Sequence, residues 1–225
     1  MLELREVTLI DKVKGEVGWA RNMDRTCARV SIVAAILFLV IVLALMFLAP
    51  EVDALKYGIS FYALTDFRAV IGVAIALVGL SAMFLGIALW PHVSVAGRVG
   101  TALLIGWGML SMPASIFPLD PPGAVPTLSG TIHNIAGLSF LLAIPAVLLV
   151  EFSGNVLTRS TGAGKVTHWL APLVPVSAIL LFAFNGPFSS LDIGGLIQRL
   201  YWLVFTVWLI FKAQQLLPNR VPASA

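Results

Sequence analysis

The sequence contains few charged residues for its length. Only 11% of its 225 residues are Asp, Glu, Lys or Arg, whereas 59% are hydrophobic. An average soluble domain carries roughly 25% charged residues. A soluble fold of this size could not hide so much apolar surface, because much of any folded surface faces water. We therefore exclude a soluble domain. We predict that the chain lies in a lipid bilayer, which is its partner and covers the apolar surface.

The sequence is equally poor in the residues that build other kinds of site. Its single cysteine, Cys27, excludes an intrachain disulfide and a cysteine metal cluster. The basic residues are scattered instead of alternating with aromatic ones, so we predict no nucleic-acid partner. We predict no cofactor and no resident metal. A metal held by Asp66, Asp120 and His133 is the weaker alternative, because structural zinc sites use four clustered ligands.

What the sequence does have is long apolar runs. A helix needs about 20 mostly apolar residues to span a bilayer, whereas a strand of a membrane barrel needs about 10 of alternating polarity. The runs here are continuous and have the helical length. They predict an all-α integral membrane bundle of about six transmembrane helices, with the fifth interrupted by Pro172 and Pro175. The six runs are 30–49, 69–90, 99–117, 131–150, 168–185 and 199–217.

The positions of lysine and arginine predict the orientation. Cytoplasmic loops of membrane proteins are enriched in these residues. Six spans place both termini on one side, together with eleven of the fourteen basic residues. We therefore predict that both termini are cytoplasmic in a multi-pass protein of the cell membrane. The eleven are Arg5, Lys12, Lys14, Arg21, Arg25, Arg29, Arg98, Arg159, Lys165, Lys212 and Arg220, and the other side has Lys56, Arg68 and Arg199.

The same runs divide the chain into three parts. Residues 1–28 form a cytoplasmic leader, 29–217 the membrane domain of six helices, and 218–225 a cytoplasmic tail. The leader mixes charges with spaced hydrophobic residues. It therefore has two interpretations, an interfacial amphipathic helix or a partly ordered leader.

Pairs of small residues one helical turn apart predict close contacts between helices. Small side chains let two helix backbones approach each other in a membrane. The pairs are Gly72 with Ala76, Ala82 with Gly86, and Ala102 with Gly106.

Polar residues gather on the predicted outer side of the membrane. Such residues near spanning helices either form a functional pocket or anchor loops through structural salt bridges. They are Tyr57, Ser60, Tyr62, Asp66, Arg68, Asp120, His133, Asn134, Asn185, Asp192, Gln198 and Arg199.

Five of these residues are the predicted ligand-binding site. His133 and Arg199 each open a helix on the outer side, and Asp120 follows the helix before His133, so all three lie at a similar depth. Asp66 and Arg68 stand at the start of the second helix. A carboxylate removed from water needs a partner, and arginine offers a matching fork of donors. We expect Asp120 to pair with Arg199 or Arg68 beside His133.

Four short motifs resemble a prokaryotic family of membrane proteins. They are Tyr57-Gly58-Ile59-Ser60, Phe117-Pro118-Leu119-Asp120, Gly130-Thr131-Ile132-His133 and Gln198-Arg199. The chain is similar over about residues 30–216 to the family known as domain of unknown function 998.

The resemblance implies a polytopic membrane fold but no activity. It also implies that Asp120, His133 and Arg199 belong to the recurring pattern of the family. Gln198 stands where the resemblance leads us to expect an acidic residue, which argues against a carboxylate pair at that place.

Three classes of function fit these residues. The first is a protein that binds or transports a small polar or amphiphilic ligand in an outer pocket. The second is a membrane-embedded enzyme acting on lipid or isoprenoid substrates through Asp120 and His133. The third is a structural membrane subunit without chemistry. We favour the first, because a mixed-charge outer mouth is what the sequence shows. No charge lies in the middle of a span, which argues against an ion-coupled pump with a buried proton relay.

Overall fold

The computed structural model describes residues 2–152 and 162–218, and the side chains from Asn22 onward. These residues form helices and loops, with no strand among them. Six helical stretches are long and apolar enough to cross a membrane. The predicted all-α bundle is therefore confirmed. The stretches are Asn22–Leu48, Arg68–His92, Val95–Ile116, Leu128–Phe152, Gly162–Asn185 and Gly194–Gln214.

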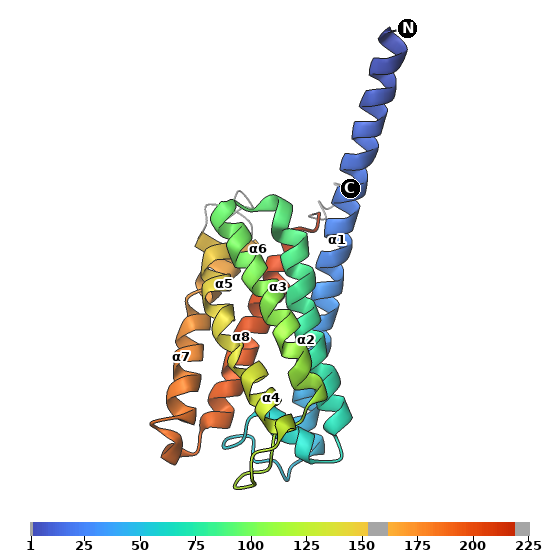
Figure 1. Ribbon diagram of the computed structural model, residues 1–225. Helices are drawn as coiled ribbons and strands as arrows, with labels where there is room; N and C mark the ends of the chain where they lie inside the picture. The colour runs from blue at the N-terminus through green and yellow to red at the C-terminus, as the bar shows by residue number, and fades with distance from the viewer. Residues whose placement is uncertain (1, 153–161, 219–225) are drawn as a thin grey trace, which may run out of the picture.

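The helices follow one another along the chain as Figure 1 shows. Two of the six spans are each built from two helices, so the described residues hold eight α-helices and three short 3₁₀ helices. In chain order they are α1 (Leu2–Leu48), η1 (Ile59–Leu64), α2 (Arg68–Leu89), η2 (Trp90–His92), α3 (Val95–Ile116), α4 (Leu128–Leu138), α5 (Phe140–Phe152), α6 (Gly162–Leu170), α7 (Leu173–Asn185), η3 (Ser189–Leu191) and α8 (Gly194–Gln214).

Proline explains the break in the fifth span. α6 ends at Leu170 and α7 begins at Leu173, with Pro172 between them. Proline has no N–H to donate to the preceding turn, and its ring displaces that turn. The interruption predicted at Pro172 is therefore confirmed, whereas the one predicted at Pro175 is wrong, because Pro175 lies in the first turn of α7, where no N–H of the helix needs to donate.

The fourth span breaks at Ser139, which the sequence did not reveal. The Ser139 N–H bonds to the carbonyl of Ala136, three residues back, and closes a tighter turn than an α-helix has. α4 and α5 meet at this turn. The outer half of the span thereby takes a direction different from that of the inner half.

The spans form a ring in chain order. Each span packs on the next one along the chain, including α5 on α7 between the fourth and fifth spans. The contact of α8 with α1 closes the ring. α7 also packs on α8, but it has no extensive contact with α4. The outer halves of the fourth and fifth spans therefore stand apart.

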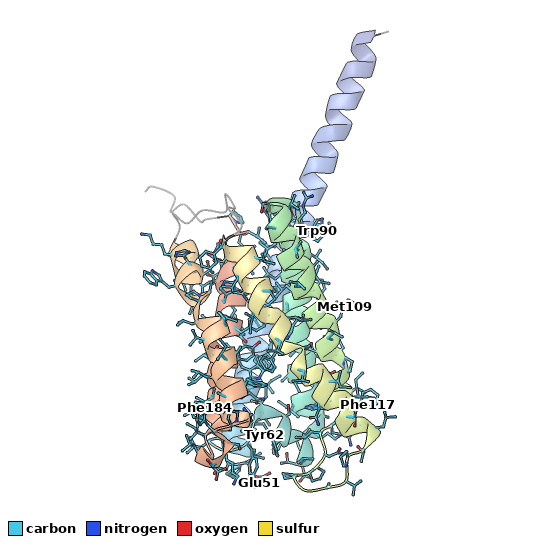
Figure 2. All side chains as sticks on the ribbon, turned by 60° about the vertical axis from the view of Figure 1, so that its left-hand side comes forward. Glu51, Tyr62, Trp90, Met109, Phe117 and Phe184 are labelled. Atoms are coloured by element: carbon cyan, nitrogen blue, oxygen red, sulfur yellow. The ribbon has the colours of Figure 1, made fainter. Side chains whose placement is uncertain are left out.

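The surface of the bundle is apolar. Phe47 is 83% exposed, and Ile179 and Phe182 are each 63% exposed. Side chains of this kind project around the bundle in Figure 2. Large exposed apolar surface of this extent is unfavourable in water and is covered by lipid in a bilayer.

Glycines bring α2 and α3 into close contact. A methyl group on Gly79 or on Gly108 would collide with the backbone of the other, and one on Gly72 with the Ser115 carbonyl. These are the close approaches expected of small residues. The predicted contact at Ala102 and Gly106 is wrong: a methyl group on Gly106 would meet nothing within 4 Å.

The leader is helical and continues into the first span. α1 runs from Leu2 to Leu48 without interruption and extends beyond the bundle (Figure 1). No break marks the predicted boundary at residue 28. Its placement along the membrane interface stays a prediction. Residues 219–225, which make up most of the predicted tail, and Arg159 lie outside the described residues.

Candidate functional site

Arg199 ties the first loop of the predicted outer end to α8. We use this name for the end that carries η1, residues 117–127 and η3, at the bottom of Figure 1. One terminal nitrogen of Arg199 donates to the carbonyls of Ala54 and Tyr57 at 2.7 and 2.6 Å. The other donates to the Tyr62 hydroxyl at 3.1 Å. The guanidinium is therefore used to hold the protein backbone.

Gln198 supports the same loop from the next position along α8. Its side-chain oxygen accepts a hydrogen bond from the Ile59 N–H at 2.6 Å. A side chain at Gly58 would collide with this amide, and one at Gly195 with the Tyr57 backbone. The motif residues 57–60 thus lie directly against the Gln198-Arg199 motif. Since the Gln198 oxygen is engaged, its amide N–H₂ remains as a free donor among the described residues.

Asp120 caps the fourth span. Its carboxylate accepts from the Thr127 N–H at 2.8 Å and from the Thr127 hydroxyl at 2.7 Å. The Thr127 hydroxyl in turn accepts from the Gly130 N–H, which makes it the N-cap of α4. The Thr127 hydroxyl, followed by its N–H, lowers the pKa of Asp120 below the ordinary value. A side chain at Gly130 would collide with this carboxylate, so Asp120 would have to move if Gly130 were replaced.

His133 lies one turn into α4 and is 94% buried, with a residual exposure of 6%. Its Nδ1 is 2.8 Å from the carbonyl oxygen of Phe117. A carbonyl only accepts, so Nδ1 carries the hydrogen. In the neutral ring Nε2 is then an acceptor, and it has no partner among the described residues.

The predicted pairing of Asp120 with Arg199 or Arg68 is wrong. Asp120 bonds to Thr127, and Arg199 to carbonyl groups and Tyr62. Asp66 and Arg68 are exposed, and neither side chain has an ion pair or hydrogen bond among the described residues. The physical reason is that backbone groups at helix ends and turns lie nearer to these side chains than the opposite charges do.

A cavity of about 460 Å³ opens at the predicted outer end. η1, α4, α7 and α8 surround it. Of the five predicted residues, His133 lines it, while Asp120, Arg199, Asp66 and Arg68 do not. Its polar lining residues are Ser60, His133, Asn134, Asn185 and Gln198.

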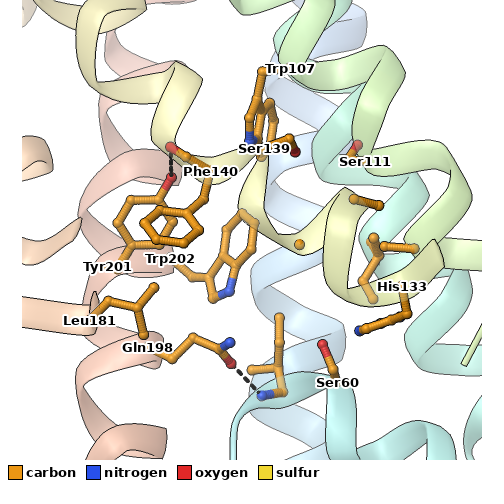
Figure 3. A pocket seen from close by; sticks show the side chains of 15 residues that line it. Ser60, Trp107, Ser111, His133, Ser139, Phe140, Leu181, Gln198, Tyr201 and Trp202 are labelled. Carbon is orange, nitrogen blue, oxygen red and sulfur yellow. Dashed lines mark hydrogen bonds between the residues drawn. The ribbon is translucent and has the colours of Figure 1, made fainter. Parts of the chain in front are cut away.

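A smaller recess of about 70 Å³ continues from the cavity into the bundle. The two share Ser60, His133, Gln198 and three other wall residues. Figure 3 shows His133 and Ser60 on one side of this recess and Gln198 and Leu181 on the other, with Trp202 between them. The Trp202 indole nitrogen is buried and has no hydrogen-bond partner.

The floor of the recess is a cluster of aromatic rings. Trp107 packs edge-on against Phe205 with ring centres 4.9 Å apart, and Trp202 packs against Phe38 at 5.5 Å. Tyr201 and Trp202 are in contact at 5.2 Å. Such pairs restrict each other's orientation. The floor is therefore restricted in its motion and includes Trp202, for which the sequence offered no signal beyond an aromatic residue in a span.

The opposite end of the bundle holds a buried ion pair. The Lys212 ammonium lies 3.0 Å from the Glu151 carboxylate, with side-chain exposures of 4% and 3%. The Thr167 hydroxyl donates to the other Glu151 oxygen at 3.2 Å and accepts from Gln215 at 2.9 Å. The cluster joins α5, α6 and α8. The sequence placed Glu151 and Lys212 at the same end but gave no sign that they meet.

The motifs thus have separate tasks. Asp120, Arg199 and the glycines shape the walls, whereas His133, Gln198 and Ser60 present polar groups to the cavity. Among the described residues, no cluster of three His, Cys, Asp or Glu side chains is suited to hold a metal ion.

Residues 32–214 match the family model described as Protein of unknown function (DUF998). The chain belongs to this family. The match begins inside the first span and ends at Gln214, the last residue of the sixth span. It therefore confirms the resemblance carried by the four motifs. No curated protein and no solved structure matches the chain.

Proposed function

We propose that this membrane protein binds a small polar or amphiphilic ligand in the cavity beside His133. The observation that carries the proposal is the cavity itself. Its volume of about 460 Å³ lies within the range of roughly 300–1,000 Å³ that is typical of small-molecule sites. Apolar walls with a few converging polar groups are also typical of such sites.

Binding is favoured over catalysis by the hydrogen bonds of the two candidate catalytic residues. A general base or acid needs a partner that tunes it and a substrate within reach. No hydrogen bond joins Asp120 to His133 among the described residues. Asp120 lies outside the cavity lining, and His133 has its Nδ1 on a backbone carbonyl. His133 is therefore proposed as a ligand contact and Asp120 and Arg199 as residues that position the walls.

The cavity is also placed where a ligand could come from the bilayer. We propose that the protein resides in the cell membrane with the cavity on the outer side. Two rim residues, Leu138 on α4 and Phe182 on α7, are 55% and 63% exposed. They edge the place where α4 and α7 stand apart.

Filling the cavity with a side chain tests the proposal. Gly137 lines both the cavity and the recess, and a side chain there would meet nothing within 4 Å. Gly137→Leu should therefore fold normally and occupy the ligand space. Gly106→Leu is the matched control, because Gly106 is also helical and open but lies on α3 away from the cavity.

The measurement is photolabelling in phosphatidylcholine nanodiscs. A mixture of diazirine-bearing single-chain amphiphiles with neutral, anionic and cationic headgroups is irradiated with the protein, and labelled peptides are mapped by mass spectrometry. We expect labelling on α4 and α7 to fall about tenfold or more in Gly137→Leu and to be unchanged in Gly106→Leu. Equal labelling of Gly137→Leu and Gly106→Leu would contradict the proposed function.

A further inference from the structure

The proposed ligand site contains no charge of its own. Among the described residues that line the cavity and its recess there is no Asp, Glu, Lys or Arg. Asp120 and Arg199 do not line this space: the Asp120 carboxylate accepts from Thr127, and both terminal nitrogens of Arg199 donate to protein groups. A charged headgroup in this space would lose its hydration without gaining a counter-charge, which is strongly unfavourable.

The polar groups of the site form a mixed set of donors and acceptors. His133 offers the Nε2 acceptor, because its Nδ1–H is bound to Phe117. Gln198 offers amide N–H donors, because its oxygen is bound to Ile59. The Ser60 hydroxyl both donates and accepts and has no partner among the described residues. Asn185 donates to the Leu181 carbonyl, which leaves its side-chain oxygen as another acceptor.

A hydroxyl group matches this set better than a neutral group that only accepts hydrogen bonds. It donates one hydrogen bond and accepts up to two, so hydroxyl groups of a ligand can bond both to an acceptor such as His133 and to a donor such as Gln198. An ester or ketone only accepts and would leave the His133 nitrogen unpaired.

The shape of the opening indicates where the rest of the ligand lies. The cavity is edged by Leu138, Phe140 and Phe182, all apolar. Leu138 and Phe182 face outward between α4 and α7, where the bilayer covers the bundle. An alkyl chain emerging here would stay in an apolar environment while the headgroup reaches the polar groups inside.

We infer that the ligand is an uncharged, hydroxyl-bearing membrane amphiphile that enters sideways between α4 and α7. This inference rests on the proposed function and narrows it to one chemical class. The headgroup lies between His133, Ser60 and Gln198, and the chain leaves past Leu138 and Phe182.

Three probes with one acyl chain test the inference. They are a diazirine monoacylglycerol, its phosphate ester, and the choline ester of the same acid, each photolabelled separately in phosphatidylcholine nanodiscs. We expect the monoacylglycerol to label α4 and α7 with at least about tenfold higher apparent affinity than either charged probe. Excess unlabelled monoacylglycerol should suppress the signal.

Two variants separate ligand contact from folding. In His133→Asn the new amide can still donate to the Phe117 carbonyl, but the Nε2 acceptor is lost. Ser60→Ala removes a hydroxyl that holds no other residue. Loss of one hydrogen bond should weaken monoacylglycerol binding about 3- to 10-fold in each. Thermal unfolding should stay close to that of the unaltered protein.

Each outcome has one meaning. If the phosphate or choline ester labels the site as well as the monoacylglycerol does, the headgroup is not selected for neutrality and this inference is wrong, although the proposed function stands. If both variants retain full monoacylglycerol affinity, the assigned contacts are wrong. If no probe gives labelling that is sensitive to Gly137→Leu, the proposed function itself fails.

Discussion

At the predicted outer end, the charged side chains of Arg199 and Asp120 hold loops in place by bonding to nearby protein groups. Arg199 replaces water for the carbonyls of Ala54 and Tyr57 and lies over the Tyr62 ring, with 5.7 Å to its centre. The planar guanidinium serves several acceptors at once, which a lysine ammonium on a flexible chain does less well. The Asp120 carboxylate likewise accepts hydrogen bonds from the N–H and the hydroxyl of Thr127. Both charges thereby fix the cavity walls without entering the cavity.

Asp120 makes the order of its loop dependent on pH. Its hydrogen bonds from Thr127 favour the carboxylate, so its pKa in the folded protein lies below the ordinary value of 3.8. Because this pKa is lowered, ionised Asp120 stabilises the folded protein above about pH 4. That stabilisation is lost as the pH falls through the pKa of Asp120 in the folded protein. We expect Asp120→Asn to be less stable than the unaltered protein at neutral pH, with a difference that shrinks at lower pH.

Thermal unfolding of both proteins between pH 7 and pH 3 measures this difference. All other carboxyl groups are shared and cancel in the comparison. A difference in melting temperature that grows as the pH falls would contradict the assignment of Asp120 as a cap.

At the scale of helices, close contacts and breaks decide the shape of the site. Gly79 and Gly108 bring α2 and α3 together, and the turn at Ser139 separates α4 from α5. α4 then leans on α3 and leaves α7 to pack on α5 and α8. The cavity exists because the outer halves of two neighbouring spans diverge.

The ion pair of Glu151 and Lys212 connects α5 to α8 at the other end. Because both groups are almost completely buried, removing one leaves the other without a partner. We expect Lys212→Met alone to reduce the free energy of unfolding by about 3–5 kcal/mol. Replacing both, with Glu151→Leu and Lys212→Met, should cost less than the sum of the single changes.

A double-mutant cycle from unfolding titrations in mixed micelles gives the coupling energy. Thr167→Val serves as a comparison, because it removes a neutral hydrogen bond to Glu151 and leaves the ion pair in place. Strictly additive effects of Glu151→Leu and Lys212→Met would show that the pair does not hold the two helices together.

At the scale of the whole molecule, the cavity lies at one end of the bundle, and the end of α8 and the part of α1 that extends beyond the bundle lie at the other. Six spans require both termini to lie on the same side of the membrane. The excess of lysine and arginine on that side predicts that it is cytoplasmic. The cavity would then open toward the outer leaflet, where the ligand would be collected.

Cysteine labelling tests this orientation. Val95 and Val125 lie at opposite ends of the bundle and are 79% and 84% exposed. In a Cys27→Ser background, a membrane-impermeant maleimide added to intact cells should label Val125→Cys. Val95→Cys should react only after the cells are opened. The reverse pattern would place the cavity on the cytoplasmic side.

The amino-acid sequence by itself determined the class of fold and the number of spans. Both follow from local quantities, since apolar run length and proline position act within one helix. The break at Pro172 could be read in this way. The break at Ser139 could not, because serine is compatible with a helix and no local signal marks the turn.

Only the tertiary structure decided which of the polar residues face the cavity. Depth along a helix follows from sequence position, and it placed Asp120, His133 and Arg199 at one level. Direction depends on which partners each side chain meets across helices. Arg199 bonds to backbone carbonyls of the first loop and Asp120 to Thr127 in its own loop, while His133, Ser60 and Gln198 were left with polar groups toward the cavity. The partners of Arg199 and Gln198 lie 145 and 139 residues away in the chain, so only the packing of the helices brings them together.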